Sequence, residues 1–533
     1  MADAVAILKR HERMVASRQS SVETVWRDCF DYSFPLRGSG ISGSVTSANT
    51  GATKQADLTD STAADSANVL ASNIVAGLTP ANALWFELDV GDESQEERAW
   101  LDETARLLWS NIHNSNYDAE AFEAALDIVC AGQFALYIDE DRDRGGFTFQ
   151  QWPLAQVWGA STRADRMVDV VHRKYPLTAE AALREFGEAA LPERVRKALA
   201  DGKGDEEFTF LHAIYPRTPH VVGARMAKNL PVASCHIEMG SKTVVRESGY
   251  HEMPVVMPRW LRAPDSVYAV GPMYAALPDV REVNFLKRLA SDAADIAVSG
   301  MYVAKDDGVI NAKTLKLGPR KVIIAADPDN IKPLNTAADF NVSEMMITNL
   351  QASIRKTLMA DQLQPQDGPA MTATEIHVRV EMIRKLLGPI YGRLMAEWLR
   401  PMIERCFGIA SRAGVFAPAP QSLQDRSYTV RYVSPLARAQ KLDEVQGVEA
   451  TFASVAQLAQ LDPTVLDELD PAEAIKIIVA GRGAPAKIQR DPKDVERVRA
   501  EREANQQKQM QQAGAIQAQT AGMEEAAKRA ATS

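Results

Sequence analysis

The sequence predicts an α+β protein that is predominantly α-helical, and three observations support this fold class. Apolar residues recur at alternating steps of four and three from Ile376 onward, which is the spacing of an amphipathic helix. Two further long stretches, 273–299 and 342–361, also read as helices. Short runs rich in β-branched and aromatic residues occur mainly between Phe134 and Glu238, so the first half mixes helices with strands.

The chain opens with helical segments. A first helix is predicted over 4–31 from the spacing of Leu8, Val15, Val22 and Trp26. A Gly/Ser/Thr-rich stretch then runs to about residue 55 and predicts a mobile loop. Asp60 or Ser61 is expected to cap the next helix, which ends near Gly77 and whose apolar face is formed by Ala63, Ala67, Leu70 and Ile74.

Helices and strands alternate through the rest of the first half. A strand-like run at 85–88 precedes two predicted helices at 95–114 and 117–131. The runs 134–138 and 146–151 predict paired strands joined by an acidic turn at 139–145. Further strands are predicted at 169–174, 208–215 and 232–238.

A polar loop between helices is the main feature of the second half. A helix at 273–299 is followed by a short Lys/Val/Ile-rich β-like block to about residue 334 and by a helix at 342–361. Thr372 and Glu375 then have the spacing of a capping box, so a long helix is expected to begin there. Pro389 and Pro401 remove backbone donors and are expected to bend it, and its apolar seam consists of Ile376, Val380, Ile383, Leu387, Ile390 and Leu394.

The C-terminal part is less regular. Residues 428–432 are strand-like, and helices are predicted at 437–459 and 471–479. The stretch 491–533 is rich in Gln, Ala, Glu and Arg without a sustained apolar stripe. It is interpreted either as a solvated helix or as disorder.

Composition excludes several classes of protein. A chain of 533 residues corresponds to about three or four domain-sized units. Its formal net charge of -10 is opposite to that of proteins that hold DNA tightly by neutralising phosphates, although a mild acidic excess also serves solubility alone. The sequence shows no signal peptide and no apolar run of the roughly 18 residues that span a membrane, so no membrane association is expected. Widely spaced cysteines predict reduced, buried thiols in the cytosol, namely Cys29, Cys130, Cys235 and Cys406.

Each candidate motif for catalysis, cofactor binding or metal binding lacks a residue or a structural context that it requires. The glycines at 38, 40 and 43 satisfy G-x-G-x-x-G but lie in a Ser/Thr loop, and 240–243 lacks the glycine of a phosphate-binding loop. Asp139, Asp141 and Asp143 have calcium-loop spacing, but Gln150 stands where a bidentate Glu is needed, so a hairpin turn is preferred. The eight histidines are scattered and are interpreted as surface or half-buried residues. No catalytic residue, cofactor or metal is therefore expected.

A set of short motifs nevertheless indicates a family. The helix that follows the polar loop contains Met371-Thr-Ala-Thr-Glu-Ile376, Leu386-Leu-Gly-Pro389, Arg393-Leu394 and Glu397, and it closes with 412–418. Together with further residues upstream, this set of motifs resembles the head-to-tail connector, or portal, proteins of short-tailed double-stranded DNA phages. The resemblance covers about 5–420 and departs from the family at Tyr268, which Gly does not follow directly. The upstream residues are Trp26, Tyr32, Pro35-Leu-Arg37, Asp57-Leu-Thr59, Leu70-Ala71, Gly77-Leu-Thr-Pro80, Trp85-Phe86, Glu247, Gly249-Tyr250, Pro254, Arg259-Trp260, Tyr268, Gly271-Pro272 and Asn284.

The resemblance implies a portal fold that assembles as a ring. Its parts would be a wing at 1–265, a first stem helix at 266–300, a clip at 301–335, a second stem helix at 336–361, a channel loop at 362–371, a long kinked wing helix at 372–416, a crown at 417–485 and a C-terminal tail at 486–533. The order of elements comes from the sequence, whereas their places in a ring come from the resemblance alone.

The resemblance also implies the function and the partners. The chain would form a homo-oligomeric ring, dodecameric in the family, at one vertex of the capsid in the virion, assembled in the host cytoplasm with major capsid and scaffolding proteins. Viral double-stranded DNA would pass through it during packaging and ejection, while the large terminase subunit and later the tail adaptor dock on it. The subunit would not be an enzyme. The alternative is a DNA-binding capsid scaffold protein that forms no ring, which requires a basic face.

Three groups of residues are candidates for these roles. Channel-loop candidates are Gln362, Gln364, Gln366, Asp367 and Met371; a plain surface turn would look the same. Channel-side stem candidates are Asp279, Glu282, Asp292 and Asp295, with Lys287 or Arg288 as opposing or intersubunit partners; the alternative is that these charges form the solvated or subunit-facing side of the helix. Candidates for docking of the adaptor or motor are the clip residues Lys305, Lys313, Lys316, Arg320 and Lys321.

Overall fold

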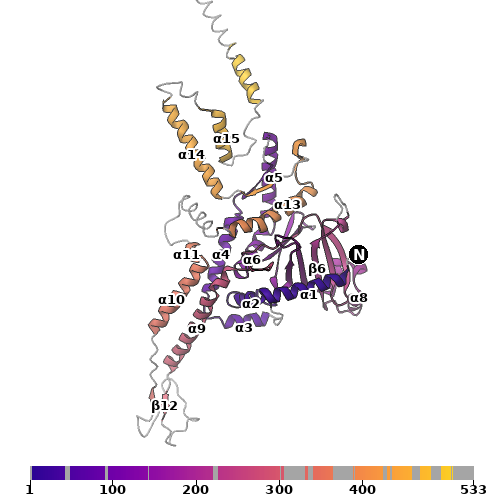
Figure 1. Ribbon diagram of the computed structural model, residues 1–533, viewed down its shortest axis with the longest axis vertical. Helices are drawn as coiled ribbons and strands as arrows, with labels where there is room; N and C mark the ends of the chain where they lie inside the picture. Colours follow the sequence, from indigo (N-terminus) through magenta and orange to yellow (C-terminus); the bar gives the residue numbers. More distant parts are fainter. Residues whose placement is uncertain are drawn as a thin grey trace, which may run out of the picture. The chain divides into compact units, whose positions relative to one another are not determined.

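The computed structural model divides into two compact units. Unit 1 comprises Met1–Trp85 and Leu107–Phe416, and unit 2 comprises Phe86–Arg106 and Ala417–Ser533. Figure 1 shows the elements of both units. The structure describes residues 3–41, 48–90, 94–141, 143–219, 226–299, 302–304, 331–333, 340–363, 388, 390–423, 429–432, 435–458, 469–481, 494–505 and 507.

The N-terminal segment forms two helices where one was predicted. Helix α1 (Ala4–Ser21) and helix α2 (Glu23–Asp31) are separated at Val22, which has a non-helical backbone with φ -137° and ψ -12°. Ser20 and Ser21 hydroxyls both donate to the Ser17 carbonyl, a side-chain contact that competes with the helical ladder. The break lets α2 leave the direction of α1.

The predicted mobile loop after residue 38 is partly wrong. Residues Ala48–Ala56 form helix α3, directly below α2 in Figure 1. Lys54 Nζ contacts Asp31 Oδ1 of α2 at 2.6 Å, so a charge pair fixes the end of α3. Propensity reasoning missed this helix because its stabilising contact comes from outside the segment.

A five-stranded antiparallel sheet forms the core of unit 1. Its strands follow one another in sequence order, β4-β5-β6-β7-β8. The predicted strands at 169–174, 208–215 and 232–238 are confirmed as its three central members. The five strands are β4 (Val157–Ala160), β5 (Val170–Thr178), β6 (Glu207–Pro216), β7 (Val232–Glu238) and β8 (Thr243–Tyr250).

Helices and a second sheet cover the two faces of this sheet. Helix α1 crosses one face, where Ile7 packs with Leu211 and Cys235. On the other face, Trp152 joins Val171 and Ile214 in one cluster. Trp152 belongs to a three-stranded sheet of β2 (Ala135–Glu140), β3 (Phe147–Trp152) and β9 (Val255–Val256), which confirms the predicted hairpin.

Small elements complete the sheet region. Helices α7 (Ala179–Phe186) and α8 (Glu193–Ala200) were not predicted; Thr178 caps α7, and both helices pack on Phe208 and Phe210. Strands β10 (Leu261–Arg262) and β11 (Ala269–Val270) pair just before Pro272, where the longest described helix of unit 1 begins. The 3-10 turns are η1 (Leu154–Gln156), η2 (Glu188–Ala190) and η3 (Ala227–Asn229).

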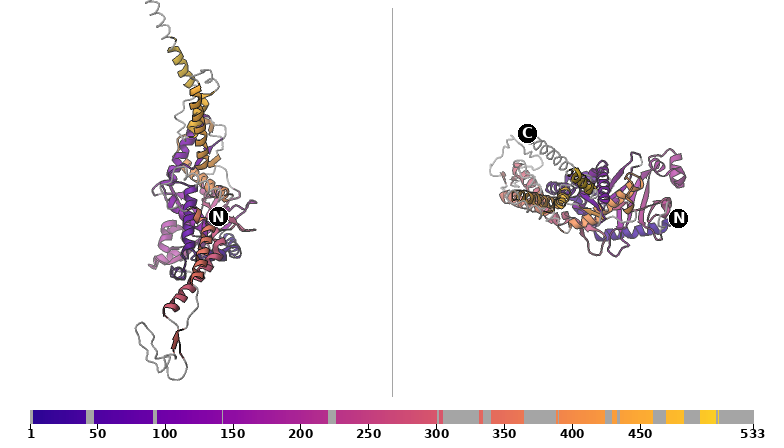
Figure 2. Two further views of the ribbon diagram at one scale, coloured as in Figure 1. Left: turned by 90° about the vertical axis from the view of Figure 1, so that its left-hand side faces the viewer. Right: turned by 90° about the horizontal axis from the view of Figure 1, so that it is seen from above.

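A helical layer carries the long paired helices of unit 1. Helices α4 (Thr62–Leu78) and α6 (Tyr117–Cys130) pack together, and α6 and α9 confirm the predictions at 117–131 and 273–299. Helices α9 (Pro272–Ser299) and α10 (Phe340–Thr357) run side by side away from the sheets in Figures 1 and 2. At their far end β12 (Tyr302–Ala304) pairs with β13 (Ile331–Pro333) in antiparallel register. Helix α11 (Ala360–Leu363) follows α10.

Only the second half of the predicted long helix lies within the described residues. The irregularity expected at Pro401 is present as a π-helical turn, η5 (Met395–Leu399), followed by α13 (Arg400–Arg412) with the proline in its first turn. A π-turn redistributes the backbone bonds that a proline interrupts. The capping box at Thr372, the first part of the seam and Pro389 lie outside the described residues.

Unit 2 brings together distant parts of the sequence. Strand β1 (Phe86–Asp89) pairs antiparallel with β14 (Thr429–Tyr432), and Trp100 of α5 (Gln95–His113) donates to the Ala417 carbonyl at 2.9 Å. Both strands were predicted, but their pairing was not. The remaining elements of unit 2 are η6 (Gln421–Leu423), α14 (Pro435–Leu458) and α15 (Pro471–Gly481). Residues 494–505 are helical.

Candidate functional site

The motif residues before α9 anchor the start of that helix. Trp26 is buried and its Nε1 donates to the Ala269 carbonyl at 2.9 Å, while the Tyr268 ring meets the Trp26 ring edge-on at 5.6 Å. The Tyr268 hydroxyl contacts both the amide and the carbonyl of Gly159 at 3.2 Å. These bonds attach the segment just before α9 to α2 and to β4.

Two glycines allow the backbone before α9 to touch the end of α6. A Cβ at Gly271 would lie 2.4 Å from the Val129 carbonyl oxygen. Gly132 has φ +82°, and a Cβ there would lie 2.1 Å from the Val270 carbonyl carbon. Only glycine tolerates both approaches, so α9 begins at a fixed position against α6, with Pro272 as its first residue.

Asn284 joins the middle of α9 to the segment before α4. Its Oδ1 accepts from the amides of Thr59 at 2.9 Å and Asp60 at 3.1 Å. The Thr59 hydroxyl in turn donates to the Asn284 carbonyl at 2.9 Å. Asn284 is buried, so these bonds hold α9 where water does not compete for them.

Asp60 connects α9, α10 and α4 through one buried carboxylate. Its Oδ2 contacts Lys287 Nζ of α9 at 2.6 Å and Gln351 Nε2 of α10 at 2.7 Å, and its Oδ1 accepts from the Thr62 amide at 2.9 Å. Burial alone would raise the pKa of Asp60, but the bonds from Lys287, Gln351 and Thr62 outweigh it and hold the pKa below its usual value. The carboxylate is therefore charged at neutral pH and clamps the paired helices to α4.

The four stem candidates do not form one group. Asp279 is half-buried and accepts from the Ser353 hydroxyl of α10 at 2.6 Å, so it lies between the two helices. Glu282, Asp292 and Asp295 are exposed on α9. Lys287, predicted as an opposing or intersubunit partner, pairs with buried Asp60 of its own chain. Arg288, which had the same prediction, donates to the Asp57 carbonyl at 2.9 Å.

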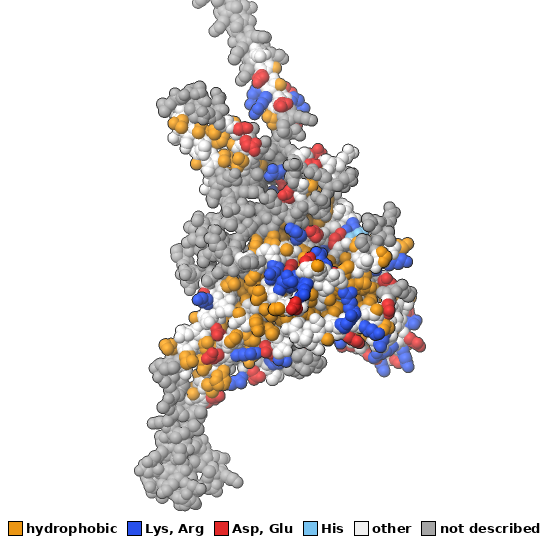
Figure 3. Space-filling model, viewed as in Figure 1, with side chains coloured by type: hydrophobic (Ala, Val, Ile, Leu, Met, Phe, Trp, Pro, Cys, Tyr) orange, Lys and Arg blue, Asp and Glu red, His pale blue; other side chains and the backbone are white. Residues whose placement is uncertain are grey.

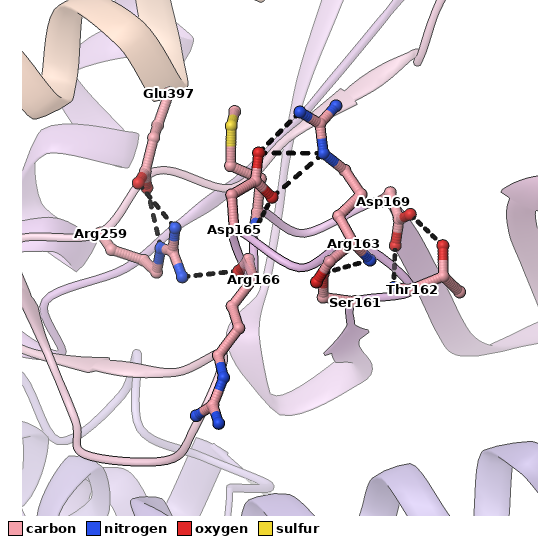
Figure 4. Close-up of polar contacts among 9 residues, drawn as sticks. Ser161, Thr162, Arg163, Asp165, Arg166, Asp169, Arg259 and Glu397 are labelled. Atoms are coloured by element: carbon pink, nitrogen blue, oxygen red, sulfur yellow. Dashed lines mark hydrogen bonds and ion pairs between the residues drawn. The ribbon is translucent and has the colours of Figure 1, made fainter.

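A buried ion pair fixes the segment that follows the predicted channel loop. Arg259, with a side chain 1% exposed, donates twice to Glu397 of η5, at 2.9 and 2.7 Å. Its third contact is the Arg166 carbonyl at 2.8 Å, as Figure 4 shows. Trp398 packs edge-on against Phe134 at 5.0 Å, so η5 is held by charge on one side and by aromatic packing on the other.

The loop that presents the Arg166 carbonyl is held by its own side chains. Arg166 has φ 57°, a backbone conformation that is uncommon outside glycine. Asp165 accepts from the Met167 amide at 3.0 Å, and Asp169 accepts from the Thr162 amide at 2.8 Å (Figure 4). The exposed Arg163 completes the turn through its contacts with Asp165.

A second ionic group holds α13. Arg405 is buried and contacts both Asp139 of β2 at 3.3 Å and Glu252 at 3.1 Å. Glu252 also binds Arg412 at 2.6 Å. Burial would raise the pKa of Glu252, but Arg412 and Arg405 lower it below its usual value. Asp139 thus serves an ion pair, and the turn after it confirms the hairpin interpretation of the acidic run, because Asp141 accepts from two turn amides.

The remaining sequence predictions have mixed outcomes. Buried, unpaired cysteines are confirmed, and the 240–243 turn lies between β7 and β8. The interpretation of the histidines as surface or half-buried is wrong for four of them, because cross-strand stacking and helix α1 bury His11, His172, His212 and His236. Within the described ranges, no group of three or more His, Cys, Asp or Glu is placed to hold a metal ion, and no helix there is long and apolar enough to cross a membrane.

Two sets of candidates fall mostly outside the described residues. Gln362 lies in α11, whereas Gln364, Gln366, Asp367 and Met371 are not described. None of the clip candidates Lys305, Lys313, Lys316, Arg320 and Lys321 is described either. Sequence reasoning noted Asp60, Asn284, Arg259 and Glu397 but not their contacts, since no local spacing signals a partner more than 130 residues away.

Comparison with known proteins gives consistent results. The family model described as bacteriophage head to tail connecting protein matches residues 4–489. The probable portal protein of Bordetella phage BPP-1 is 26% identical over 490 residues, 87% of this chain and 84% of that protein. The portal protein of Salmonella phage epsilon15 is 25% identical over 501 residues, 91% and 89% of the two chains.

More distant likenesses were also found. The portal protein of Escherichia phage T7 is 20% identical over 434 residues, which are 78% of this chain and 77% of its own. Among solved structures, the neck of an empty GTA particle computed with C6 symmetry covers 70% of this chain and 84% of its own, with 13% identity and a TM-score of 0.31. The last likeness is too weak to support an argument.

Proposed function

The chain belongs to the family of bacteriophage head to tail connecting proteins, and from this membership we infer that it is a portal protein, the connector between phage head and tail. The observation that carries the inference is the family match, which extends over residues 4–489. Relatives that align with most of the chain bear the same name. The proposals below concern how this chain performs that function.

We propose that the working form is a closed homo-oligomeric ring, of 12 subunits, at one vertex of the capsid. Helices α9 and α10 support a role as the stem of such a ring, because they form an antiparallel pair that extends from the sheet region (Figure 2). The clamp formed by Asp60 with Lys287 and Gln351 fixes their position on α4. An element that lines a channel needs such a rigid base.

We propose that DNA passes through the ring without being held. Each Lys or Arg that neutralised a phosphate would create a free-energy minimum from which the DNA must escape at every step. The net charge of -10 is suited to sliding. In this proposal, the large terminase subunit supplies the chemical energy, and the portal subunit itself has no catalytic role.

The anchors on both sides of the predicted channel loop support a role for residues 362–371 in contact with DNA. Before the loop, Leu358 and Ala360 are buried. After it, Arg393 donates to the Trp260 carbonyl at 2.8 Å and Glu397 binds Arg259. A loop whose two flanking elements are fixed to unit 1 transmits a contact with DNA to the body of the subunit.

Shortening the loop tests this role. Deletion of 364–369 is expected to leave rings intact and to impair packaging or retention of DNA, because the steric contact is lost. The measurement is the DNA content of assembled heads, with a Gly/Ser segment of equal length at 364–369 as the length-matched control. Genome-filled heads from the deletion at normal yield would refute the role.

Docking of the tail adaptor or motor is proposed for the clip. Reversal of charge at the five basic clip candidates is expected to weaken tail attachment while ring formation persists, because the partner surface then meets like charges. Reversal at Arg196 and Lys197, two exposed residues of α8, is the matched control. Tail attachment that is unchanged by the clip variant would contradict the proposal. We also propose that the chain contacts major capsid and scaffolding proteins during assembly in the host cytoplasm.

Mass measurement tests the ring itself. A purified protein of ring mass, seen as closed rings by negative-stain electron microscopy, is the expected result. A compact monomer at every concentration would refute the ring and leave the alternative, a DNA-binding capsid scaffold protein. That alternative predicts strongly salt-dependent binding to linear duplex DNA, and the family match does not favour it.

A further inference from the structure

Large apolar side chains are exposed on the paired helices. Among the described residues, five of the large hydrophobic side chains that remain exposed lie on α9 and α10: Tyr274, Phe285, Leu289, Met345 and Met346. Figure 3 shows hydrophobic side chains gathered over this part of the surface. Phe285 and Met345 are 61% and 62% exposed, so the packing within this chain leaves most of both side chains in water. Concentrated exposure of this kind indicates an interaction surface.

The exposed residues lie on opposite edges of the helix pair. Tyr274, Phe285 and Leu289 fall within roughly 60° of one another on α9, at about 100° per residue. Their stripe is turned about 120° from Asp279, which faces α10. On α10, Met345 lies half a turn from buried Ile354 and so points away from the core. One edge of the pair therefore carries Phe285 and Leu289, and the other carries Met345.

A cavity lies beside the first edge. It has a volume of about 370 Å³, and Tyr32, Phe285, Arg281 and Arg288 are among the residues that line it. Its lining comes from α9 and from the segment that includes the end of α2 and α3, and no residue of α10 contributes. The cavity thus opens on the side of α9 that is turned away from α10.

The two edges carry complementary groups at the same position along the helix axes. Asp279 pairs with Ser353, and Asp60 joins Lys287 to Gln351, so α9 and α10 run in antiparallel register. The pairing of Tyr302 with Pro333 continues that register in β12 and β13. Met345 is therefore level with Leu289 along the helix axes, and exposed Glu344 is level with exposed Arg288.

We propose that Met345 of one copy of this chain packs on Phe285 and Leu289 of the next copy, at the mouth of the cavity, and that Glu344 pairs there with Arg288. Methionine suits this position because its flexible thioether adapts to an aromatic edge. The contact is heterologous, since two different edges meet, and repetition around a closed ring uses both edges of every copy. The inference rests on the proposed ring and names the surface that would join its members.

Paired cysteines test this contact. Leu289→Cys combined with Met345→Cys, treated with a short bis-maleimide, is expected to give a ladder of covalent oligomers above the dimer on a denaturing gel. Each single variant serves as a control and is expected to stay monomeric on that gel. The four native cysteines are buried and unpaired, and burial raises the pKa of Cys130 to about 12, so the native thiols react little.

The possible outcomes separate this inference from the ring proposal. A ladder from the double variant alone supports the contact. Rings of normal mass without a ladder overturn the contact and leave the ring proposal standing. Covalent dimers without higher species overturn it as well, because they indicate a contact between identical edges. A protein that never forms rings refutes both proposals together.

Discussion

Removal of Arg259 is expected to loosen the segment around η5 while the rest of unit 1 stays folded. The variant Arg259→Ala leaves Glu397 without its bidentate partner and the Arg166 carbonyl without a donor. The Arg259 side chain is 1% exposed and that of Glu397 11%, so water does not replace these bonds. Breaking one side of such a buried pair costs about 3–5 kcal/mol. Since about 1.4 kcal/mol corresponds to a factor of ten, local opening becomes roughly one hundred to a few thousand times more frequent.

Amide hydrogen exchange measures this opening directly. Exchange in η5 and α13 is expected to accelerate by that factor in Arg259→Ala, while amides of β6 and β7 keep their rates. The double variant Arg259→Met with Glu397→Leu is expected to recover much of the protection, because it leaves no buried charge unpaired. Arg163→Ala, which removes an exposed pair in the same loop, is the matched control and is expected to leave η5 unchanged. Unaltered exchange in Arg259→Ala would show that aromatic packing of Trp398, and not the ion pair, holds the turn.

Two further predictions concern the start of α9 and the sheet. Gly271→Ala is expected to abolish soluble folded protein, because the added Cβ would lie 2.4 Å from a backbone oxygen. Gly392→Ala, at an open helical position, is the control and is expected to leave the melting temperature unchanged or to raise it. Equal melting temperatures for the two variants would contradict the close approach at Gly271. Burial, with His11 and Arg10 adding to the effect, lowers the pKa of His172 to about 3. Burial, Lys174 and Arg18 lower the pKa of His11 to about 4. The unfolded chain therefore binds more protons than the folded chain, and stability is lost as pH falls below about 6.5. His172→Leu is expected to remove about 3 kcal/mol of this loss at pH 4, and a melting curve as acid-sensitive as that of the unchanged protein would refute it.

Local patterns predicted most of the elements, whereas long-range contacts decided where prediction failed. Helices α6 and α9 and strands β5, β6 and β7 were predicted, because apolar periodicity and turn residues act within a few positions. Helix α3 was missed because its stabilising pair joins Lys54 to Asp31 of another helix. The break at Val22 was missed because apolar spacing continues across it, while Arg18 bonds the Leu154 and Val157 carbonyls far along the chain.

In the candidate site, too, local sequence patterns indicated the charged residues but not their long-range contacts. On α9, Asp279 was predicted as a channel-side residue and Lys287 as an opposing or intersubunit partner. In the structure, Asp279 bonds Ser353 of α10 and Lys287 bonds Asp60. A helix that packs on two neighbours presents charge to each of them, and sequence gives no means to tell these faces from the one that meets solvent. Contacts over more than 200 residues, such as Thr59 with Asn284, have no local signal at all.

Several residues that carry the family resemblance hold α9 and η5 in place, and none of these anchoring residues is a candidate for the channel face. Trp26, Tyr268 and Gly271 fix where α9 begins, Asn284 fixes its middle, and Arg259 with Glu397 fixes η5. Each acts through a backbone contact or a bidentate pair, for which few other residue types have the right geometry. A channel wall requires only suitable charge and width, which many sequences supply. Likeness in this family should therefore be strongest where the direction of the stem is set and weakest along the surface that DNA would pass.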